Sequence, residues 1–352
     1  MNEMRPLLLE LYARYPKARL SDYIKLLYQS EFGCEHFAPE DTTGHTLLLR
    51  ELETARPGQH LMEKVGGGYW RVYLKNAREL GAAPETLYAM FRETARNSHG
   101  SRERFRAKLR ELEALCEEGL LPFSPGIFQL YWLNYEAAGL PAVHHSQEYR
   151  KAYAPSYRVI QDDFARFFEL FLRIDRMLLR EKSPLLIAID GPCAAGKTTL
   201  AARLAACYEC SVFHTDDFYL RPEQKTPRRL AQAGGNMDRE RLAAEVLDPL
   251  QRRETVLYRP YSCRTQTVSN GSALPFRQLN IIEGSYSLHP DLRRYYDLKV
   301  VLDIAPDHQW NRLKRRESQK SLELFRDRWI PLEQNYARDT KLMDCADLYY
   351  PC

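Results

Sequence analysis

One short stretch of the chain has residue types and spacing that suit chemistry on phosphate groups. Residues 191–199 read GPCAAGKTT and satisfy the pattern G-x-x-x-x-G-K-[ST]. Between a strand and a helix, the backbone N–H groups of such a loop and the positive end of the helix dipole surround a polyphosphate. Lys197 then adds a positive charge, and the hydroxyl of Thr198 can ligate Mg²⁺. The pattern therefore predicts nucleotide binding.

The stretches on either side of this loop have the character that such a site needs. The apolar run Leu185–Asp190 suits a buried parallel strand, and residues 200–206 are typical of a helix. The residues predicted to hold the nucleotide phosphates are Gly191, Cys193, Ala194, Ala195, Gly196, Lys197, Thr198 and Thr199.

Carboxylates follow two other strand-like runs. Asp216 and Asp217 come directly after residues 211–215, and Glu283 ends the run 279–283. The carboxyl ends of parallel strands border the crevice where α/β sheets bind ligands. One aspartate could accept the proton of an attacking hydroxyl and the other could hold water around Mg²⁺, while Glu283 could help to hold the metal. The alternative for the aspartates is an ordinary helix cap.

A basic segment follows the fourth predicted strand. Residues 310–317 include Arg312, Arg315 and Arg316. A migrating phosphoryl group spreads negative charge over its oxygens, and arginines on a closing lid can stabilise that charge. A solvated helix face or a nucleic-acid contact is the alternative. Because the phosphate-binding pattern lies upstream, we favour the lid, with Arg315 and Arg316 at the nucleotide.

The apolar runs also predict the fold of the C-terminal part. Five short runs are separated by stretches of helical character, and they lie at 185–190, 211–215, 279–283, 298–304 and 346–350. This alternation is typical of a parallel sheet with helices on both faces. We therefore expect an α/β fold, a P-loop NTPase domain with a five-stranded parallel sheet, over residues 183–352.

The apolar periodicity of the N-terminal part predicts a mainly α-helical domain over residues 1–155. The sequence leaves the role of this domain open. Helices are expected at 84–97 and 101–118, where apolar residues group on one face. The pattern breaks near residues 152–156. A continuous apolar stripe from about Tyr157 to Arg180 then predicts a helix, which makes 156–182 a connecting segment.

Two local features of the N-terminal part are less ordinary. The run Gly66–Gly68 predicts a tight turn and not a second phosphate loop, because no lysine follows it. Cys34, His36 and the pair His144–His145 could form a metal site. Their spacing matches no recognised metal motif, so we favour capped helix ends and partly buried histidines.

The composition is that of an ordinary soluble protein. The 352 residues are 44% hydrophobic and 28% charged, which allows two or three domains. The net charge of +4 is small for this length, so nucleic-acid binding is not expected. No run approaches the ~18 apolar residues of a membrane span. The start of the chain lacks a signal-peptide layout, which favours a cytoplasmic protein. A homo-oligomer is compatible with the sequence.

The eight cysteines are scattered along the chain, and reduced thiols are expected. Cys207 and Cys210 match C-x-x-C, but no second pair lies nearby to complete a zinc site. We favour structural thiols over a redox pair.

Several motifs of residues 183–352 together resemble the uridine kinase and phosphoribulokinase group of small-molecule kinases. In chain order they are 191–199, Asp216–Tyr219, Asn236–Asp238, Tyr258–Tyr261, Ile282–Gly284, and Arg312 with Arg315 and Arg316. The resemblance implies ATP and Mg²⁺ as cofactors. It implies that Asp216 is the general base, with Lys197 and Arg312 beside the phosphates. Thr198 and Glu283 would lie around Mg²⁺, where Asp217 is a further candidate ligand, and Asp238 and Tyr261 would contact the acceptor.

The chain departs from this family at the acceptor side. Uridine kinases usually follow the tyrosine with Asp-Phe and, a few residues on, a histidine that reads the pyrimidine. Here Gln266 lies at the histidine position, and Arg264 lies where the family is usually apolar or neutral. Gln266 can still donate and accept hydrogen bonds. Arg264 could face a phosphate or carboxylate of the acceptor, and Asp238 could also cap the helix that follows it.

These features favour an ATP-dependent kinase that transfers the γ-phosphoryl group to a hydroxyl of a small metabolite, such as a nucleoside. The alternative is a regulatory switch that binds ATP while the helical domain binds a partner protein or nucleic acid. The acceptor-side residues Asp216, Asp238 and Tyr261 speak against it, because a pure switch would not need them. A third hypothesis is a separate active site within residues 1–155.

Overall fold

The computed structural model describes residues 3–34, 43–180 and 184–351. The chain divides into two compact units, Met1–Arg176 and Met177–Cys352.

The C-terminal unit is built on a five-stranded sheet whose strand order is β12-β11-β4-β10-β5, with every neighbouring pair parallel. The strands are β4 (Leu185–Asp190), β5 (Cys210–His214), β10 (Leu279–Glu283), β11 (Leu298–Asp303) and β12 (Leu348–Pro351). Every residue of β4 and β10 is buried, which explains why most of their residues are apolar. The predicted α/β fold with five parallel strands is confirmed.

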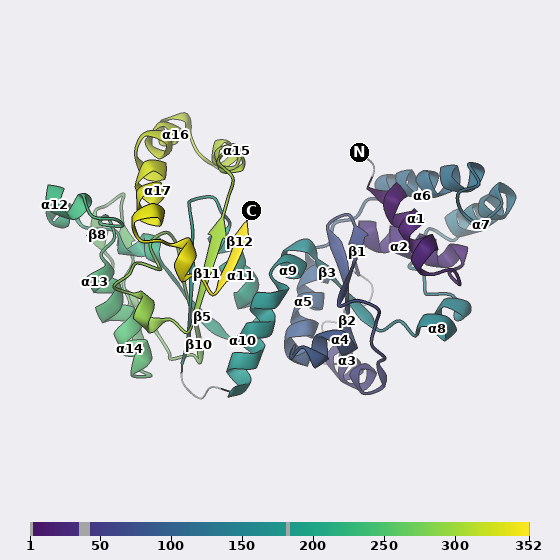
Figure 1. Ribbon diagram of the computed structural model, residues 1–352, viewed down its shortest axis with the longest axis horizontal. Coiled ribbons are helices and arrows are strands. Elements are labelled where there is room, and N and C mark those ends of the chain that lie inside the picture. The colour runs from purple at the N-terminus through teal and green to yellow at the C-terminus, as the bar shows by residue number, and fades with distance from the viewer. Residues whose placement is uncertain (1–2, 35–42, 181–183, 352) are drawn as a thin grey trace. The chain divides into compact units, whose positions relative to one another are not determined.

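Helices flank this sheet (Figure 1). The main helices of the unit are α11 (Lys197–Cys207), α13 (Arg239–Leu242), α14 (Asp248–Gln251), α15 (Pro306–Arg316), α16 (Gln319–Leu324) and α17 (Ile330–Asp339). The short α12 (Pro227–Leu230) precedes α13. Further along the chain, β6 (Val256–Tyr258) pairs antiparallel with β9 (Ser272–Leu274), and between them β7 (Tyr261–Ser262) and β8 (Thr267–Val268) form a small hairpin.

The main core of this unit lies on one face of the sheet. Leu186 and Ala188 of β4 and Ile282 of β10 pack there against Leu242 and Leu250 from the helices that follow β5. Alternate strand residues point to opposite faces, so Leu185, Ile187 and Ile189 of β4, which are also buried, face the other side. Burial on both faces holds β4 rigidly, and with it the loop that leaves its carboxyl end.

The N-terminal unit is mainly helical, as predicted. Its helices are α1 (Met4–Arg14), α2 (Leu20–Phe32), α3 (Thr43–Thr54), α4 (Leu74–Glu79), α5 (Pro84–Arg96), α6 (Arg102–Glu117), α7 (Pro125–Ala137), α8 (Gln147–Tyr153), α9 (Asp162–Arg166) and the start of α10 (Phe168–Arg180). The helices predicted at 84–97 and 101–118 are confirmed as α5 and α6. The unit also contains an antiparallel sheet of β1 (Met62–Gly66), β2 (Tyr69–Tyr73) and β3 (Tyr157–Gln161).

The three glycines at 66–68 form the turn between β1 and β2, as predicted. All three have positive φ angles. A Cβ atom on Gly67 would lie 1.7 Å from the carbonyl oxygen of Ser30, so this turn requires glycine there.

The continuous helix predicted from about Tyr157 to Arg180 is wrong at its start. Residues 157–161 form strand β3, which pairs antiparallel with β2, and α9 and α10 follow. Both Val159 and Ile160 are buried. The apolar stripe has helical spacing, but the β-branched and aromatic residues of Tyr157–Gln161 also suit a strand, and pairing with β2 decides between the two.

Candidate active site

The loop at 191–199 leads from β4 into the first turn of α11. Gly191 has a φ of +140°, and a Cβ atom there would lie 2.0 Å from the carbonyl oxygen of Leu302. Gly196 has a φ of +101° directly before the helix. Both glycines are therefore required by the backbone. The predicted order of strand, loop and helix is confirmed.

Lys197 is buried within the curve of this loop. Its Nζ donates to the carbonyl oxygens of Gly191 at 2.8 Å and Pro192 at 2.9 Å, and it lies 3.3 Å from Oγ of Ser285. The ammonium group is thus fixed between the loop and the segment that follows β10. A fixed cation at the N-terminus of a helix makes the loop a favourable place for an anion.

Two of the predicted metal ligands lie in contact. The Thr198 hydroxyl, in the first turn of α11, donates to Oε1 of Glu283 at 3.0 Å. Nδ1 of His214 lies 2.5 Å from the same oxygen, and this hydrogen bond raises the pKa of His214. A hydroxyl and a carboxylate are the hard oxygen ligands that Mg²⁺ prefers, so the donor set fits that ion. No sequence pattern indicated that His214 is the partner of Glu283.

The third predicted ligand, Asp217, is engaged elsewhere. Its carboxylate accepts a hydrogen bond from the hydroxyl of Tyr258, and that hydroxyl lies 3.2 Å from the backbone nitrogen of His214. Burial raises the pKa of Tyr258, so the phenol stays protonated and remains a donor.

Asp216 lies in the turn of 3₁₀ helix Thr215–Phe218 that directly follows β5. The side chain is exposed, and its Oδ1 accepts a hydrogen bond of 2.9 Å from the Tyr219 hydroxyl. One donor therefore orients the carboxylate and leaves its exposed side open to a substrate. This is the arrangement that an aspartate needs to accept a proton.

Helix α15 brings one of its three arginines to the loop. Arg312 Nη1 donates to the carbonyl oxygen of Ala194 at 2.9 Å. Arg316 pairs instead with Glu317 at 2.8 Å, and Arg315 is exposed on the same helix. Gln309 of α15 also contacts the loop, donating to the carbonyl oxygen of Cys193 at 3.0 Å.

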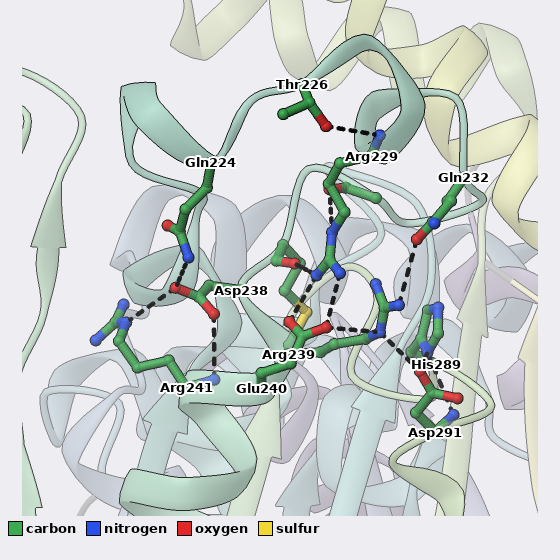
Figure 2. Close-up of polar contacts among 12 residues, drawn as sticks. Gln224, Thr226, Arg229, Gln232, Asp238, Arg239, Glu240, Arg241, His289 and Asp291 are labelled. Carbon is green, nitrogen blue, oxygen red and sulfur yellow. Dashed lines mark hydrogen bonds and ion pairs between the residues drawn. The ribbon is translucent and has the colours of Figure 1, made fainter.

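Asp238 is buried and caps α13. One carboxylate oxygen accepts from the backbone N–H of Arg241 at 3.2 Å, and the other accepts from Nε2 of Gln224 at 2.9 Å (Figure 2). The cap expected from the sequence is confirmed. Asp238 also lines an open hollow of about 320 Å³. The residues around it are Arg221, Gln224, Asp238, Arg241, Glu245, Arg259 and Val268.

A polar network braces the segment before α13. Arg229 pairs with Glu240 at 2.7 Å, and it also donates to the carbonyl oxygens of Gly235 and Met237 (Figure 2). Arg239 pairs with Asp291 at 2.7 Å. These contacts hold the chain on either side of Asp238 in place.

The remaining predicted acceptor residues belong to the β7–β8 hairpin. Tyr261 is buried, and its hydroxyl has no hydrogen-bond partner among the described residues. A buried hydroxyl without a partner is costly unless a ligand or water completes it. Arg264 and Gln266 are exposed in the turn of the hairpin, where Gln266 has a φ of +59°. Tyr261 is therefore buried, whereas Arg264 and Gln266 of the same hairpin are exposed to solvent.

Three residues that the sequence did not single out connect the loop to its surroundings. Asp190 is buried and accepts hydrogen bonds from the backbone N–H groups of Gly191 at 2.6 Å and Leu288 at 2.7 Å, and from the Tyr336 hydroxyl at 2.8 Å. Burial raises the pKa of Asp190. Glu333 of α17 accepts from the backbone N–H of Cys193 at 2.9 Å. Because acids are common on amphipathic helices, the sequence did not indicate that Glu333 binds the loop.

The metal hypothesis for the N-terminal part gains no support. Over the described residues there is no group of three or more His, Cys, Asp and Glu side chains that could hold a metal ion. His36 lies outside the described residues. His145 is bound to Asp22 at 2.7 Å and to the Tyr157 hydroxyl at 2.7 Å, which is the role of a buried structural histidine.

Cys207 and Cys210 form no disulfide with each other. Burial raises the pKa of the Cys193 thiol in the loop to about 12, so this thiol stays protonated. In the described part of the chain, none of the helices has both the length and the apolar character for crossing a membrane.

The C-terminal part of the chain is similar to solved structures of kinases, and the N-terminal part is unmatched. A possible uridine kinase from Bacillus stearothermophilus is 21% identical over 52% of this chain and 99% of that one, with a TM-score of 0.38. A candidate fructose transport system kinase from Silicibacter sp. TM1040 is 24% identical over 51% and 95%, with a TM-score of 0.40.

A deoxyadenosine kinase from M. mycoides with bound dATP is 17% identical over 47% of this chain and 89% of that one, with a TM-score of 0.22. No protein-family model matches the chain, and no curated protein is similar to it in sequence. The P-loop α/β fold of the C-terminal unit is seen in its own strand order and in the loop before α11.

Proposed function

We propose that the C-terminal unit is a phosphotransferase that moves the terminal phosphoryl group of ATP to a hydroxyl of a small metabolite. The observation that supports this most strongly is the alignment of three strand ends. In the sheet, Glu283 lies opposite Ile189 of β4 and opposite His214 of β5. The phosphate loop begins two residues after Ile189, and Asp216 follows His214 by two, so loop, metal ligand and base emerge at one edge.

The residues divide the work of the reaction in this proposal. The loop and Lys197 bind the phosphates, and Arg312 adds positive charge beside the loop. Asp216, oriented by Tyr219, accepts the proton of the acceptor hydroxyl. Thr198 and Glu283 would hold Mg²⁺, which when bound neutralises charge on the phosphate oxygens. Asp238 and the buried hydroxyl of Tyr261 orient the acceptor.

The test is a screen of the full chain with ATP, Mg²⁺ and a panel of nucleosides, sugars and vitamins, read by mass spectrometry. We expect a new product that is heavier than one of the added metabolites by one phosphoryl group, with ADP formed in equal amount. ATP hydrolysis that no metabolite accelerates and that yields no phosphorylated product would instead favour a nucleotide-dependent switch.

A further inference from the structure

A carboxylate of the protein itself contacts the phosphate loop. Oε2 of Glu333 accepts the backbone N–H of Cys193 at 2.9 Å, and Oε1 accepts the hydroxyl of Ser285 at 2.7 Å. Cys193 belongs to the loop after β4, and Ser285 belongs to the segment after β10. Glu333 thus joins the two segments that border the proposed nucleotide site.

The surroundings explain why an acid is stable there. Oγ of Ser285 lies 3.3 Å from the ammonium group of Lys197, and the loop leads into the N-terminus of α11. Backbone N–H groups, a helix N-terminus and a lysine together attract an anion. A carboxylate and a terminal phosphate both present anionic oxygens as acceptors, so both are suited to the same donors.

The helix that carries Glu333 is firmly anchored. Tyr336 lies three residues further on, hence on the same side of α17. It is buried, and its hydroxyl donates to Asp190 at 2.8 Å. Asp190 in turn accepts the backbone N–H of Gly191, so helix and loop share one buried anchor. Glu333 itself is only partly buried, and rotation of its side chain alone would free both donors.

We propose that Glu333 is a built-in competitor for the terminal phosphate of the nucleotide. Its carboxylate holds the Cys193 N–H and the Ser285 hydroxyl until a phosphate group replaces it, and it then turns away while α17 stays in place. The residue thereby lowers the affinity of the site for ATP. This inference rests on the proposed nucleotide site, but it does not depend on which acceptor is used or on whether transfer occurs.

The opposite view is that Glu333 only braces the loop. The two views predict opposite changes in ATP affinity when Glu333 is replaced. Loss of a brace weakens ATP binding, whereas loss of a competing anion strengthens it. Replacement of Glu333 by glutamine keeps the size of the side chain and removes its charge. Asp339 provides a matched control, because this exposed acid lies on the same helix and pairs with Arg338 at 2.9 Å.

The experiment measures ATP binding to the full chain by calorimetry in the presence of Mg²⁺, with no acceptor. We expect Glu333→Gln to lower the Kd for ATP by at least about fivefold. Asp339→Asn should change it by less than about twofold, because a lone surface charge contributes little. Thermal unfolding without nucleotide verifies that each variant folds.

Unchanged or weaker ATP binding by Glu333→Gln would overturn the inference and leave the proposed phosphotransfer standing. If that variant fails to fold, Glu333→Asp replaces it, because the shorter acid cannot span both donors and should also bind ATP more tightly. Tighter ATP binding by Glu333→Gln, together with no phosphorylated product in the metabolite screen, would support the competitor and count against the proposed transfer. Absence of ATP binding in every variant would overturn both.

Discussion

The hydroxyl of Thr198 donates a hydrogen bond of 3.0 Å to Oε1 of Glu283 and so joins the start of α11 to the end of β10. The two residues are 85 positions apart in the chain, yet parallel pairing of β10 with β4 brings them together at one edge of the sheet. This contact assembles the oxygen ligands that the proposed function assigns to Mg²⁺.

Glu283→Gln should raise the Mg²⁺ concentration needed for half-maximal ATP turnover by about tenfold or more, because an amide holds the ion and its water less strongly than a carboxylate. Titration of Mg²⁺ at fixed ATP measures this. Glu209→Gln, which alters an exposed acid paired with Arg277 on the same unit, is the control and should leave the Mg²⁺ dependence unchanged. An identical Mg²⁺ requirement for Glu283→Gln would remove this residue from the metal site.

Asp216→Asn should slow phosphoryl transfer by about 10²–10⁴-fold, the range typical of a lost general base, while the Kd for ATP stays nearly the same. Steady-state kinetics and calorimetry separate the two quantities. Tyr219→Phe removes the hydroxyl that donates to Asp216 and should cause a smaller loss of kcat. Transfer at the normal rate by Asp216→Asn would mean that another group accepts the proton.

Tyr336→Phe should lower the free energy of unfolding of the C-terminal unit by about 1–3 kcal/mol, because it leaves the buried carboxylate of Asp190 with one donor fewer. Tyr349→Phe removes a comparable hydrogen bond to Asp303 from a half-exposed tyrosine, and it should cost less than about 0.5 kcal/mol. Chemical denaturation measures both variants. If both variants lost the same free energy of unfolding, burial of the contact between Tyr336 and Asp190 would add nothing to stability.

Acid should destabilise the N-terminal unit below about pH 6.5 through His145. Burial lowers the pKa of His145 to about 3, from 6.5 as its ordinary value, so the unfolded chain binds a proton that the folded chain does not. Stability should therefore decrease as the pH falls from 6.5 towards 3, by at most about 1.4 kcal/mol per pH unit for this group.

Denaturation of His145→Gln between pH 4 and pH 7 tests this direction. Whatever its absolute stability, the free energy of unfolding of the variant should depend less steeply on pH. His144→Gln, at the exposed neighbouring position, should keep the slope of the unaltered chain. Asp22 acts in the same direction at lower pH, because its hydrogen bonds lower the pKa of its carboxyl despite burial. A slope that the His145→Gln substitution leaves unchanged would exclude this histidine as the acid-sensitive group.

Much of the C-terminal unit could be predicted from local patterns. Strands buried on both faces read as apolar runs, and the phosphate loop has a fixed glycine spacing because Gly191 and Gly196 occupy backbone conformations that other residues rarely adopt. The turn at Gly66–Gly68 follows the same logic. Each of these features depends on residues that are neighbours in sequence.

The features that sequence analysis missed depend on distant partners. The apolar stripe around Ile160 also fits a helix. Strand β3 forms there because its backbone pairs with β2, which lies almost 90 residues earlier in the chain. The contact of Glu333 with Cys193 of the loop joins residues 140 positions apart, and that of Tyr336 with Asp190 at the end of β4 joins residues 146 positions apart. An acid and a tyrosine on an amphipathic helix look like surface and core residues until the fold places that helix at the loop.

A crystal structure of the full chain with Mg²⁺ and a non-hydrolysable ATP analogue would test the central claim most directly. The account predicts the terminal phosphate at the loop of residues 191–199, the metal ion beside Thr198 and Glu283, and the Asp216 carboxylate facing the space next to that phosphate. A nucleotide bound away from this loop, or an Asp216 side chain directed away from the terminal phosphate, would contradict it.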